Sequence, residues 1–347
     1  MKKRPLGRTG LTVSELCLGT MTWGNQTGEA DAHAQMDMAL DHGIDFLDTA
    51  EMYPTQPVRA ETVGDTERVI GSWLKKTGRR GDVVIATKVT GEGSRFVRDG
   101  APVTGAIIEK AVDDSLRRLN TDVIDLYQLH WPNRGSYHFR KHWTYDASGQ
   151  DRAATLAHME DVLGALARLV QAGKIRHFGL SNESAWGMAQ WLRLADEGAG
   201  PRAASIQNEY SLLCRGYDTD LAELGVNEDV TLLAFSPLAA GMLTGKYAGD
   251  VTPEGSRRSC TPDLGGRIAP RVWEAVSAYL GVAQRHGLDP TQMAVAWCLT
   301  RPFPMIPIIG ATTAGQLDVV LGAADLTLAP EVLDEITAAY KAHPMPF

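Results

Sequence analysis

Residues 82–130 contain the segments DVVIATK (82–88), GAIIEKAVDDSLRRL (105–119) and VIDLYQLH (123–130), in that order. The first and third are almost continuously apolar, which is typical of strands buried on both faces of a sheet. The middle segment repeats apolar residues at helical spacing, and Thr104 precedes it as a suitable N-cap. This stretch therefore predicts a strand–helix–strand unit with parallel strands.

The same alternation extends over the whole chain. Further helices are predicted over 65–77 and 155–172, and a glycine follows each (Gly78 and Gly173) as a suitable helix end. The strand-like runs are SELCLGT (14–20), IDFLDT (44–49), DVVIATK (82–88), VIDLYQLH (123–130), IRHFGLS (175–181), ASIQNEY (204–210), VTLLAFS (230–236) and MIPIIGA (305–311). Eight such repeats in 347 residues predict an α/β fold, a (β/α)8 TIM barrel. The competing doubly wound sheet would open with a G-x-G-x-x-G turn, which the sequence lacks.

Three segments interrupt the alternation. Residues 1–13 are expected to form a β-hairpin around Arg8-Thr9-Gly10, ahead of the first barrel strand. Residues 131–155, rich in aromatic residues, and residues 240–270, rich in Gly, Pro and Arg, are long loops that follow strands. Both are expected at the C-terminal face, where barrel enzymes keep their chemistry. The whole chain, 1–347, is interpreted as one barrel domain.

Composition excludes several functional classes. The chain has 34 Lys and Arg against 42 Asp and Glu, a net charge of −8, which argues against a general nucleic-acid binder. No apolar run is long enough for a membrane span. The four cysteines are too widely spaced for a disulfide scaffold or zinc site, and His138 and His142 lack a third metal ligand. We therefore expect a cytoplasmic protein that binds no metal, nucleic acid or membrane; the sequence leaves the oligomeric state open.

Chemically reactive residues stand at the ends of the predicted strands. Asp48, Lys88 and His130 each close a strand, and Tyr53 follows Asp48 by five positions. In a barrel these ends converge on one mouth. A lysine there needs a charged partner, for which Asp48 is the candidate, and the pair is expected to lower the pKa of Tyr53. Tyr53 would then be a general acid, with His130 orienting a substrate carbonyl.

These residues belong to motifs that resemble those of the aldo-keto reductase superfamily. The matching segments are DTAEMY (48–53), ATK (86–88), LYQLHWP (126–132), GKIRHFGLSN (173–182), IQNEYS (206–211) and FSPL (235–238). The segments LGRTGL (6–11) and GKY (245–247) resemble the bacterial Tas-like branch related to potassium-channel β subunits. The likeness covers nearly the whole chain, from about residue 4 to residue 340.

The resemblance implies an NADP-dependent oxidoreductase that reduces aldehydes or ketones to alcohols. Hydride would come from NADPH, or alternatively NADH, and Tyr53 would be the proton donor. Asp48 and Lys88 would tune Tyr53, and the partner would be a small-molecule carbonyl compound. The substrate pocket would be formed by Trp23, Tyr53, His130 and Trp131.

The resemblance also implies a cofactor site. Ser181, Asn182 and Gln207 would hold the nicotinamide carboxamide, and Tyr210 would stack on the nicotinamide ring. The other expected cofactor contacts are Gly19, Thr20, Met21, Asp48, Ser236, Leu238, Gly241, Lys246, Gly310, Thr312 and Gln316.

Two positions depart from the pattern of many relatives. Thr313 stands where Arg or Lys often binds the 2′-phosphate of NADPH, and Val320 replaces a frequent Asn. Arg257 and Arg258 in the long loop are alternative sources of positive charge for that phosphate.

Two other functions fit parts of the sequence. A cofactor-sensing regulatory subunit with slow, vestigial turnover would carry the same four residues. A barrel hydrolase or aldolase with Lys88 as a Schiff base is disfavoured because it leaves Ser181, Asn182, Gln207 and Tyr210 unexplained.

Overall fold

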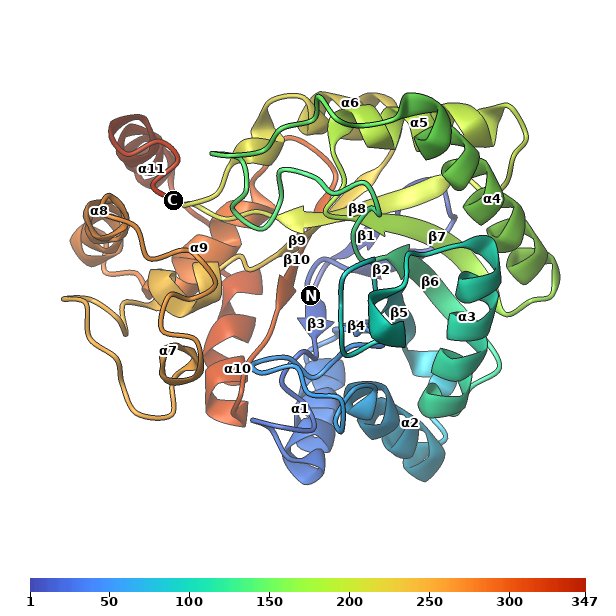
Figure 1. Ribbon diagram of the computed structural model, residues 1–347. Coiled ribbons are helices and arrows are strands. Elements are labelled where there is room, and N and C mark those ends of the chain that lie inside the picture. Colours follow the sequence, from blue (N-terminus) through green and yellow to red (C-terminus); the bar gives the residue numbers. More distant parts are fainter.

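The computed structural model describes every residue from Met1 to Phe347. Its centre is a closed barrel of parallel strands in the order β10-β3-β4-β5-β6-β7-β8-β9, with helices around it (Figure 1). The barrel strands are β3 (Cys17–Gly19), β4 (Phe46–Asp48), β5 (Val84–Val89), β6 (Ile124–Leu129), β7 (Ile175–Ser181), β8 (Ala203–Glu209), β9 (Thr231–Phe235) and β10 (Met305–Ile309). Each falls within one residue of a predicted run, so the predicted (β/α)8 barrel is confirmed.

The helices follow the strands along the chain. They are α1 (Glu29–Asp41), α2 (Asp65–Thr77), α3 (Gly105–Leu119), α4 (Arg152–Gln171), α5 (Ala185–Asp196), α6 (Leu221–Asn227), α7 (Arg257–Cys260), α8 (Val272–Arg285), α9 (Pro290–Leu299), α10 (Ala314–Leu321) and α11 (Pro330–Ala342). The predicted bounds of α2 and α3 are confirmed, and the Thr104 side chain caps α3 as expected. Helix α4 begins earlier than the predicted residue 155 because the Asp151 side chain accepts a hydrogen bond from Ala154 N.

The predicted N-terminal hairpin is confirmed and lies against the barrel interior. Strands β1 (Lys3–Pro5) and β2 (Thr12–Ser14) pair antiparallel, and Leu6 and Val13 are fully buried. These two residues join a cluster with inward-facing barrel residues, namely Cys17, Phe46, Ala86, Leu126, Leu233, Ile306 and Ile308. The lower barrel is therefore filled with apolar side chains, and polar chemistry is confined to the C-terminal end.

The two long segments at the C-terminal face meet at one carboxylate. Arg140, between β6 and α4, donates to Glu209 Oε2 at 2.7 Å, and Arg267, between β9 and α8, donates to Glu209 Oε1 at 2.8 Å. Glu209 is the last residue of β8, so both segments are fixed to the barrel rim.

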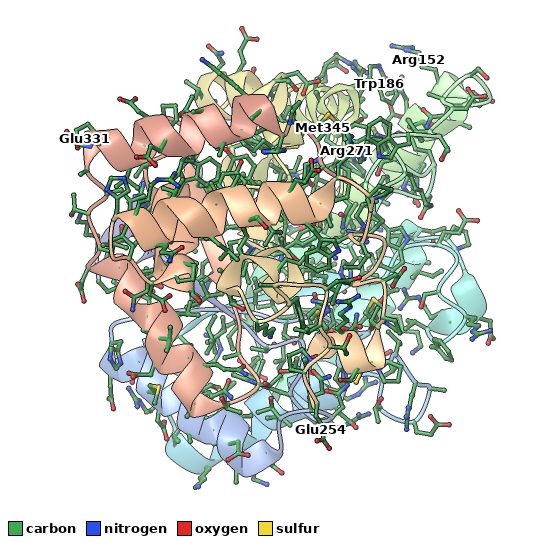
Figure 2. The ribbon with its side chains drawn as sticks, turned by 90° about the vertical axis from the view of Figure 1, so that its left-hand side faces the viewer. Arg152, Trp186, Glu254, Arg271, Glu331 and Met345 are labelled. Carbon is green, nitrogen blue, oxygen red and sulfur yellow. The ribbon has the colours of Figure 1, made fainter.

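The segment that leads into α8 is also held by the C-terminal tail. Figure 2 shows Arg271 beside Met345, whose carbonyl oxygen accepts a hydrogen bond from Arg271 Nη2 at 2.6 Å. Among the helices, none combines the length and the apolar character that a membrane crossing requires.

Candidate active site

The strand periodicity brings Asp48 and Lys88 together inside the barrel mouth. Asp48 follows the inward-facing Phe46 by two positions in β4, and Lys88 follows Ala86 in the same way in β5. Lys88 Nζ donates to Asp48 Oδ2 at 2.7 Å and to the Thr49 carbonyl at 2.7 Å. Burying this ammonium is tolerable because both contacts compensate its lost hydration.

Tyr53 and His130 lie beside this pair. Lys88 Nζ is 4.9 Å from the centre of the Tyr53 ring, and the Tyr53 and His130 ring centres are 5.8 Å apart in an edge-on arrangement. The side chains of Tyr53 and His130 are nearly buried, at 9% and 8% exposure. The structure thus brings the four predicted catalytic residues into one site.

The expected lowering of the Tyr53 pKa is not found. Burial raises the pKa of the phenol above its ordinary value of 10.0 and outweighs the lowering effect of Lys88, while Asp48 raises it further. The sequence-based expectation considered the ammonium but not the desolvation of the phenolate or the charge of Asp48. Tyr53 therefore carries its proton throughout the neutral range, which is the form that a proton donor needs.

Lys88 is held in its charged form and His130 in its neutral form. Burial lowers the pKa of Lys88, but Asp48 and Tyr53 more than offset this, so its pKa stands above the ordinary value. Burial and the nearby Lys88 charge hold the pKa of His130 well below 6.5. Lys88 is therefore a protonated amine, which cannot form a Schiff base in that state, and His130 is a neutral imidazole.

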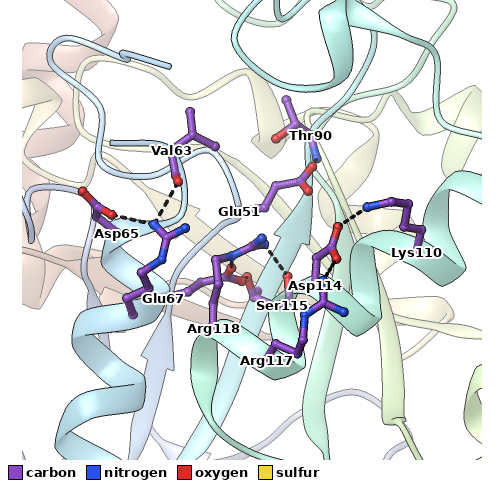
Figure 3. Close-up of polar contacts among 12 residues, drawn as sticks. Glu51, Val63, Asp65, Glu67, Thr90, Lys110, Asp114, Ser115, Arg117 and Arg118 are labelled. Atoms are coloured by element: carbon purple, nitrogen blue, oxygen red, sulfur yellow. Dashed lines mark hydrogen bonds and ion pairs between the residues drawn. The ribbon is translucent and has the colours of Figure 1, made fainter. Parts of the chain in front are cut away.

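Two buried carboxylates, Glu51 and Glu67, support the strand end that carries Lys88. Glu51 accepts hydrogen bonds from the Thr90 backbone N–H and from Arg98 Nη1, the latter at 2.7 Å, and lies beside Thr90 in Figure 3. Glu67 accepts from Thr87 Oγ1 at 2.6 Å. Because Thr87 and Thr90 flank Lys88 and Val89, these carboxylates fix the end of β5 from outside the barrel.

Glu67 also connects α2 with α3. Arg118 Nε donates to Glu67 Oε2 at 2.6 Å, and the Arg118 guanidinium also donates to Ser115 Oγ at 3.2 Å (Figure 3). At the N-terminus of α2, Gly64 N donates to the Tyr53 carbonyl at 3.0 Å. The loop that presents Tyr53 is therefore attached to a helix that is itself fixed by a buried carboxylate.

Ser181, Asn182 and Gln207 also lie at the mouth. Ser181 Oγ donates to the Gln207 carbonyl at 2.7 Å, and Asn182 Nδ2 donates to the His130 carbonyl at 2.9 Å. Asn182 Oδ1 is buried without a hydrogen-bond partner. An unsatisfied buried acceptor is costly unless a ligand completes it, so Asn182 is suited to receive an N–H donor.

Tyr210 does not have the expected place. Its ring is fully buried, stacks on Trp297 with ring centres 5.5 Å apart, and its hydroxyl donates to Asp218 Oδ1 at 2.5 Å. No face of this ring is free to stack on a nicotinamide, because Tyr210 points into the layer between barrel and helices.

Phe235, which the sequence-based reasoning missed, does reach the mouth. It ends β9 two positions after the inward-facing Leu233, packs on the interior cluster and is only partly buried. The signal was present in the sequence, since the period of two along VTLLAFS puts Leu233 and Phe235 on the same face.

The two predicted substrate tryptophans differ in exposure. Trp23 is fully buried and its Nε1 donates to Gln35 Oε1 at 3.2 Å, so it presents no surface to a substrate. This corrects the expected role of Trp23, which follows a strand end but turns under α1. Trp131 is partly exposed, with its ring centre 4.9 Å from that of His130 and 6.1 Å from that of Phe139. Trp131 and Phe139 therefore form the aromatic wall of the mouth.

The remaining predicted cofactor residues lie along the C-terminal rim. Thr20 is buried and its Oγ1 donates to the Asp48 carbonyl at 2.9 Å, while Thr312 Oγ1 donates to Gln316 Oε1 at 3.0 Å. The exposed or partly exposed members are Gly19, Met21, Ser236, Leu238, Gly241, Lys246, Gly310, Thr312 and Gln316. Their roles stay predictions.

The two positions that depart from the pattern of many relatives have structural roles. Thr313 caps α10 through its side chain, and Val320 is buried in the core.

Arg257 has an unusual position among the charged groups near the mouth. Its guanidinium makes no hydrogen bond or ion pair within the protein, and its Nε is buried without a partner. Burial and the positive charge of Arg267 lower the pKa of Arg257 to about 10. By contrast, Arg258 Nη2 pairs with Asp250 Oδ1 at 2.5 Å.

Arg257 therefore belongs to a cluster with excess positive charge. Arg140, Arg257 and Arg267 surround one carboxylate, Glu209, and the Arg257 charge also acts on Tyr53. Three guanidiniums against one carboxylate favour the binding of an anion at the mouth.

Comparisons with known proteins agree with this geometry. A family model described as "Aldo/keto reductase family" matches residues 15–341. "Protein tas" of Escherichia coli (strain K12) is 43% identical over 352 residues, covering 100% of this chain and 99% of that protein. "Aldo-keto reductase yakc [NADP(+)]" of Schizosaccharomyces pombe is 30% identical, covering 93% of this chain and 86% of its own length. "Probable voltage-gated potassium channel subunit beta" of Arabidopsis thaliana is 30% identical, covering 99% and 98% respectively.

Proposed function

Because the chain belongs to the aldo/keto reductase family, we propose that it reduces an aldehyde or a ketone to an alcohol with a nicotinamide cofactor. The observation that carries this proposal is the arrangement of Tyr53 and His130 beside the buried Lys88–Asp48 pair at the barrel mouth. The proposed substrate is a small carbonyl compound, and the aromatic wall formed by Trp131 and Phe139 favours an apolar or aromatic one.

In the proposed reaction, the protein supplies the proton and orients the carbonyl. Tyr53 gives its phenolic proton to the carbonyl oxygen as that oxygen gains negative charge. The protonated Lys88 beside Tyr53 stabilises the resulting phenolate, and Asp48 keeps Lys88 in place. A bound nicotinamide would supply the hydride.

His130 is suited to binding the substrate oxygen. Its Nδ1 is buried without a partner, and neither ring nitrogen makes a hydrogen bond within the protein. A neutral imidazole carries one N–H, which is therefore free to donate to the carbonyl oxygen. Because His130 is uncharged, it polarises the carbonyl without competing with Tyr53 as the acid.

The residues at the mouth fit a nicotinamide cofactor. The unpartnered Asn182 Oδ1 would accept from the carboxamide N–H, and Phe235 offers a partly exposed ring for stacking. The unpaired Arg257 would bind the pyrophosphate, near Ser236, whose Oγ accepts from Arg267 at 3.4 Å.

NADPH is the proposed cofactor and NADH the alternative. A relative whose printed name includes NADP(+) supports NADPH. The rim near Thr312 and Thr313 contributes hydroxyls rather than a guanidinium, whereas Arg257 lies near Glu209, Tyr247 and Arg267. We therefore assign Arg257 to the pyrophosphate, which the two cofactors share, rather than to the 2′-phosphate.

The direct test is oxidation of NADPH and of NADH by the wild-type protein with a reactive aromatic aldehyde, followed by loss of absorbance. The proposal predicts aldehyde-dependent oxidation and formation of the corresponding alcohol. Cofactor binding without turnover across a panel of aldehydes and ketones would reject the proposed activity.

Cofactor binding without turnover would favour a cofactor-sensing regulatory subunit. This candidate has one observation in its support, the likeness to a protein named as a probable potassium channel β subunit. It predicts slow turnover together with a defined assembly with another protein, which copurification would detect.

We further propose a cytoplasmic location, which the four free cysteines support.

A further inference from the structure

Gln128 is a fully buried amide inside the barrel mouth. It lies in β6, two positions after the inward-facing Leu126, and its register partners are Lys88 in β5 and Gly179 in β7. The inward position below it is apolar, so Gln128 marks the level at which the barrel interior becomes polar.

The hydrogen bonds of Gln128 connect three strands. Its Nε2 donates to Asp48 Oδ1 at 3.3 Å, and its Oε1 accepts from Gln207 Nε2 at 3.3 Å. Gln207 Nε2 also donates to Asp48 Oδ1 at 2.8 Å, whereas Asp48 Oδ2 is taken by Lys88. Each carboxylate oxygen of Asp48 therefore has its own partners.

The chemistry of these groups fixes the orientation of both amides. An ionised carboxylate only accepts hydrogen bonds, so Gln128 and Gln207 must both turn their NH2 groups toward Asp48. Both N–H groups of Gln207 are then used, one by Asp48 and one by Gln128. Gln207 Oε1 has no partner in the protein and is directed away from Asp48.

The barrel makes room for the Gln128 side chain at Gly179. A Cβ atom on Gly179 would lie 3.3 Å from Gln128 Cγ and 2.4 Å from Ser205 Oγ. An apolar side chain at position 128 would continue the layer of Leu126 without the cost of burying an amide. The presence of Gln128 is therefore explained by its hydrogen bonds to Asp48 and Gln207 rather than by packing.

We propose that Gln128 is a positioning residue for the cofactor site, an inference that rests on the proposed function. By accepting from Gln207 Nε2, it keeps Gln207 Oε1 available as an acceptor for the carboxamide N–H of the nicotinamide. Without that acceptor, Asp48 alone holds the Gln207 amide, and the second Gln207 N–H loses its partner.

The test compares the affinity for NADP⁺ with that for its 3-acetylpyridine analogue, in which a methyl group replaces the carboxamide NH2. Dissociation constants are measured by calorimetry for the wild type, Gln128→Met and Gln128→Glu. Met removes both hydrogen-bonding ends of the side chain. Glu has the same length and keeps the acceptor for Gln207 but introduces a charge beside Asp48. The fragment 2′-phospho-ADP-ribose, which lacks the nicotinamide, is the control ligand.

The wild type is expected to bind the analogue at least about tenfold more weakly than NADP⁺, because the analogue offers no N–H to Gln207 Oε1 or to Asn182 Oδ1. Gln128→Met is expected to lower this ratio about fivefold, which leaves the share of Asn182, with unchanged affinity for the control fragment. Gln128→Glu is expected to keep the wild-type ratio because it retains the acceptor. A residue with a merely structural role would change the affinity for both ligands together and leave the ratio intact.

Equal ratios in the wild type and Gln128→Met would overturn the inference, as would loss of the ratio in both variants. If Gln128→Met does not fold, Gln128→Leu replaces it. If neither variant folds, Gln128→Glu decides: loss of the affinity ratio between the analogue and NADP⁺ overturns the inference, and retention of that ratio supports it. A wild type that binds NADP⁺ but does not discriminate would refute the inference alone. A wild type that binds neither NADP⁺ nor NAD⁺ would refute the proposed function itself.

Discussion

The Lys88 ammonium lies 2.7 Å from Asp48 Oδ2, and both side chains are almost completely withdrawn from solvent. Neither charge would be stable at the barrel mouth alone, and together they create a fixed dipole beside Tyr53. The pair explains how a buried phenol can give up its proton at the mouth, because the cation that stabilises the phenolate is already in place.

The first prediction concerns the stability of this pair. Lys88→Met leaves the Asp48 carboxylate buried without its cation, and we expect it to lower the free energy of unfolding by about 3 kcal/mol or more. Asp48→Asn combined with Lys88→Met removes both charges and is expected to cost less than the sum of the single changes. Urea denaturation of the wild type, the two single variants and the double variant measures the coupling. Additive losses of unfolding free energy would show that the two charges do not depend on each other.

The second prediction is the pH dependence of kcat/KM for carbonyl reduction. Tyr53 must be protonated to act, and its pKa is raised above 10.0, so activity is lost only as the pH rises past that value. His130 must be neutral, and its pKa lies well below 6.5, so activity is lost on the acid side only well below that value. We expect a level profile between these limits. A rise or fall centred near neutral pH would contradict the assigned protonation states.

The third prediction separates the two adjacent arginines of the long segment. Arg257 has no partner in the protein, and Arg257→Ala is expected to weaken NADPH and NADH binding alike, by about tenfold. Arg258 is paired with Asp250, and Arg258→Ala serves as the matched control with little expected effect. Fluorescence titration gives both dissociation constants. A loss confined to NADPH would instead assign Arg257 to the 2′-phosphate.

The fourth prediction distinguishes the two aromatic candidates for stacking. Phe235→Ala is expected to raise the dissociation constant for NADPH roughly fivefold, in keeping with the energy of one aromatic stack. Tyr210→Leu removes the ring and its hydrogen bond to Asp218, and is expected to lower stability by about 2 kcal/mol or more while leaving the cofactor affinity of the folded protein unchanged. Calorimetry and thermal unfolding together decide the assignment. The opposite pattern would restore Tyr210 to the cofactor site.

The barrel could be predicted from the sequence because its strands are buried on both faces. Continuous apolar runs such as DVVIATK (82–88) and IRHFGLS (175–181) mark such strands within a residue or two. The positions of Asp48, Lys88 and His130 at strand ends then place them at one mouth, since parallel strands of a closed barrel all end on the same side.

The details that could not be predicted depend on the direction of a side chain or on the balance between burial and nearby charges. Trp23 and Tyr210 both follow strands, but their rings turn into the layer between barrel and helices. The pKa of Tyr53 depends on how far burial exceeds the effect of Lys88, which no spacing reveals. The unpaired state of Arg257 likewise requires knowing where every nearby carboxylate lies.

The measurement that tests the central claim most directly compares wild type with Tyr53→Phe. Oxidation of NADPH and of NADH is followed with a reactive aromatic aldehyde, and cofactor binding is titrated for both proteins. We expect Tyr53→Phe to lower kcat by roughly 10²- to 10⁴-fold, the usual contribution of a positioned acid, with cofactor affinity retained. Equal rates in the two proteins would show that Tyr53 is not the proton donor and that the site is assigned wrongly.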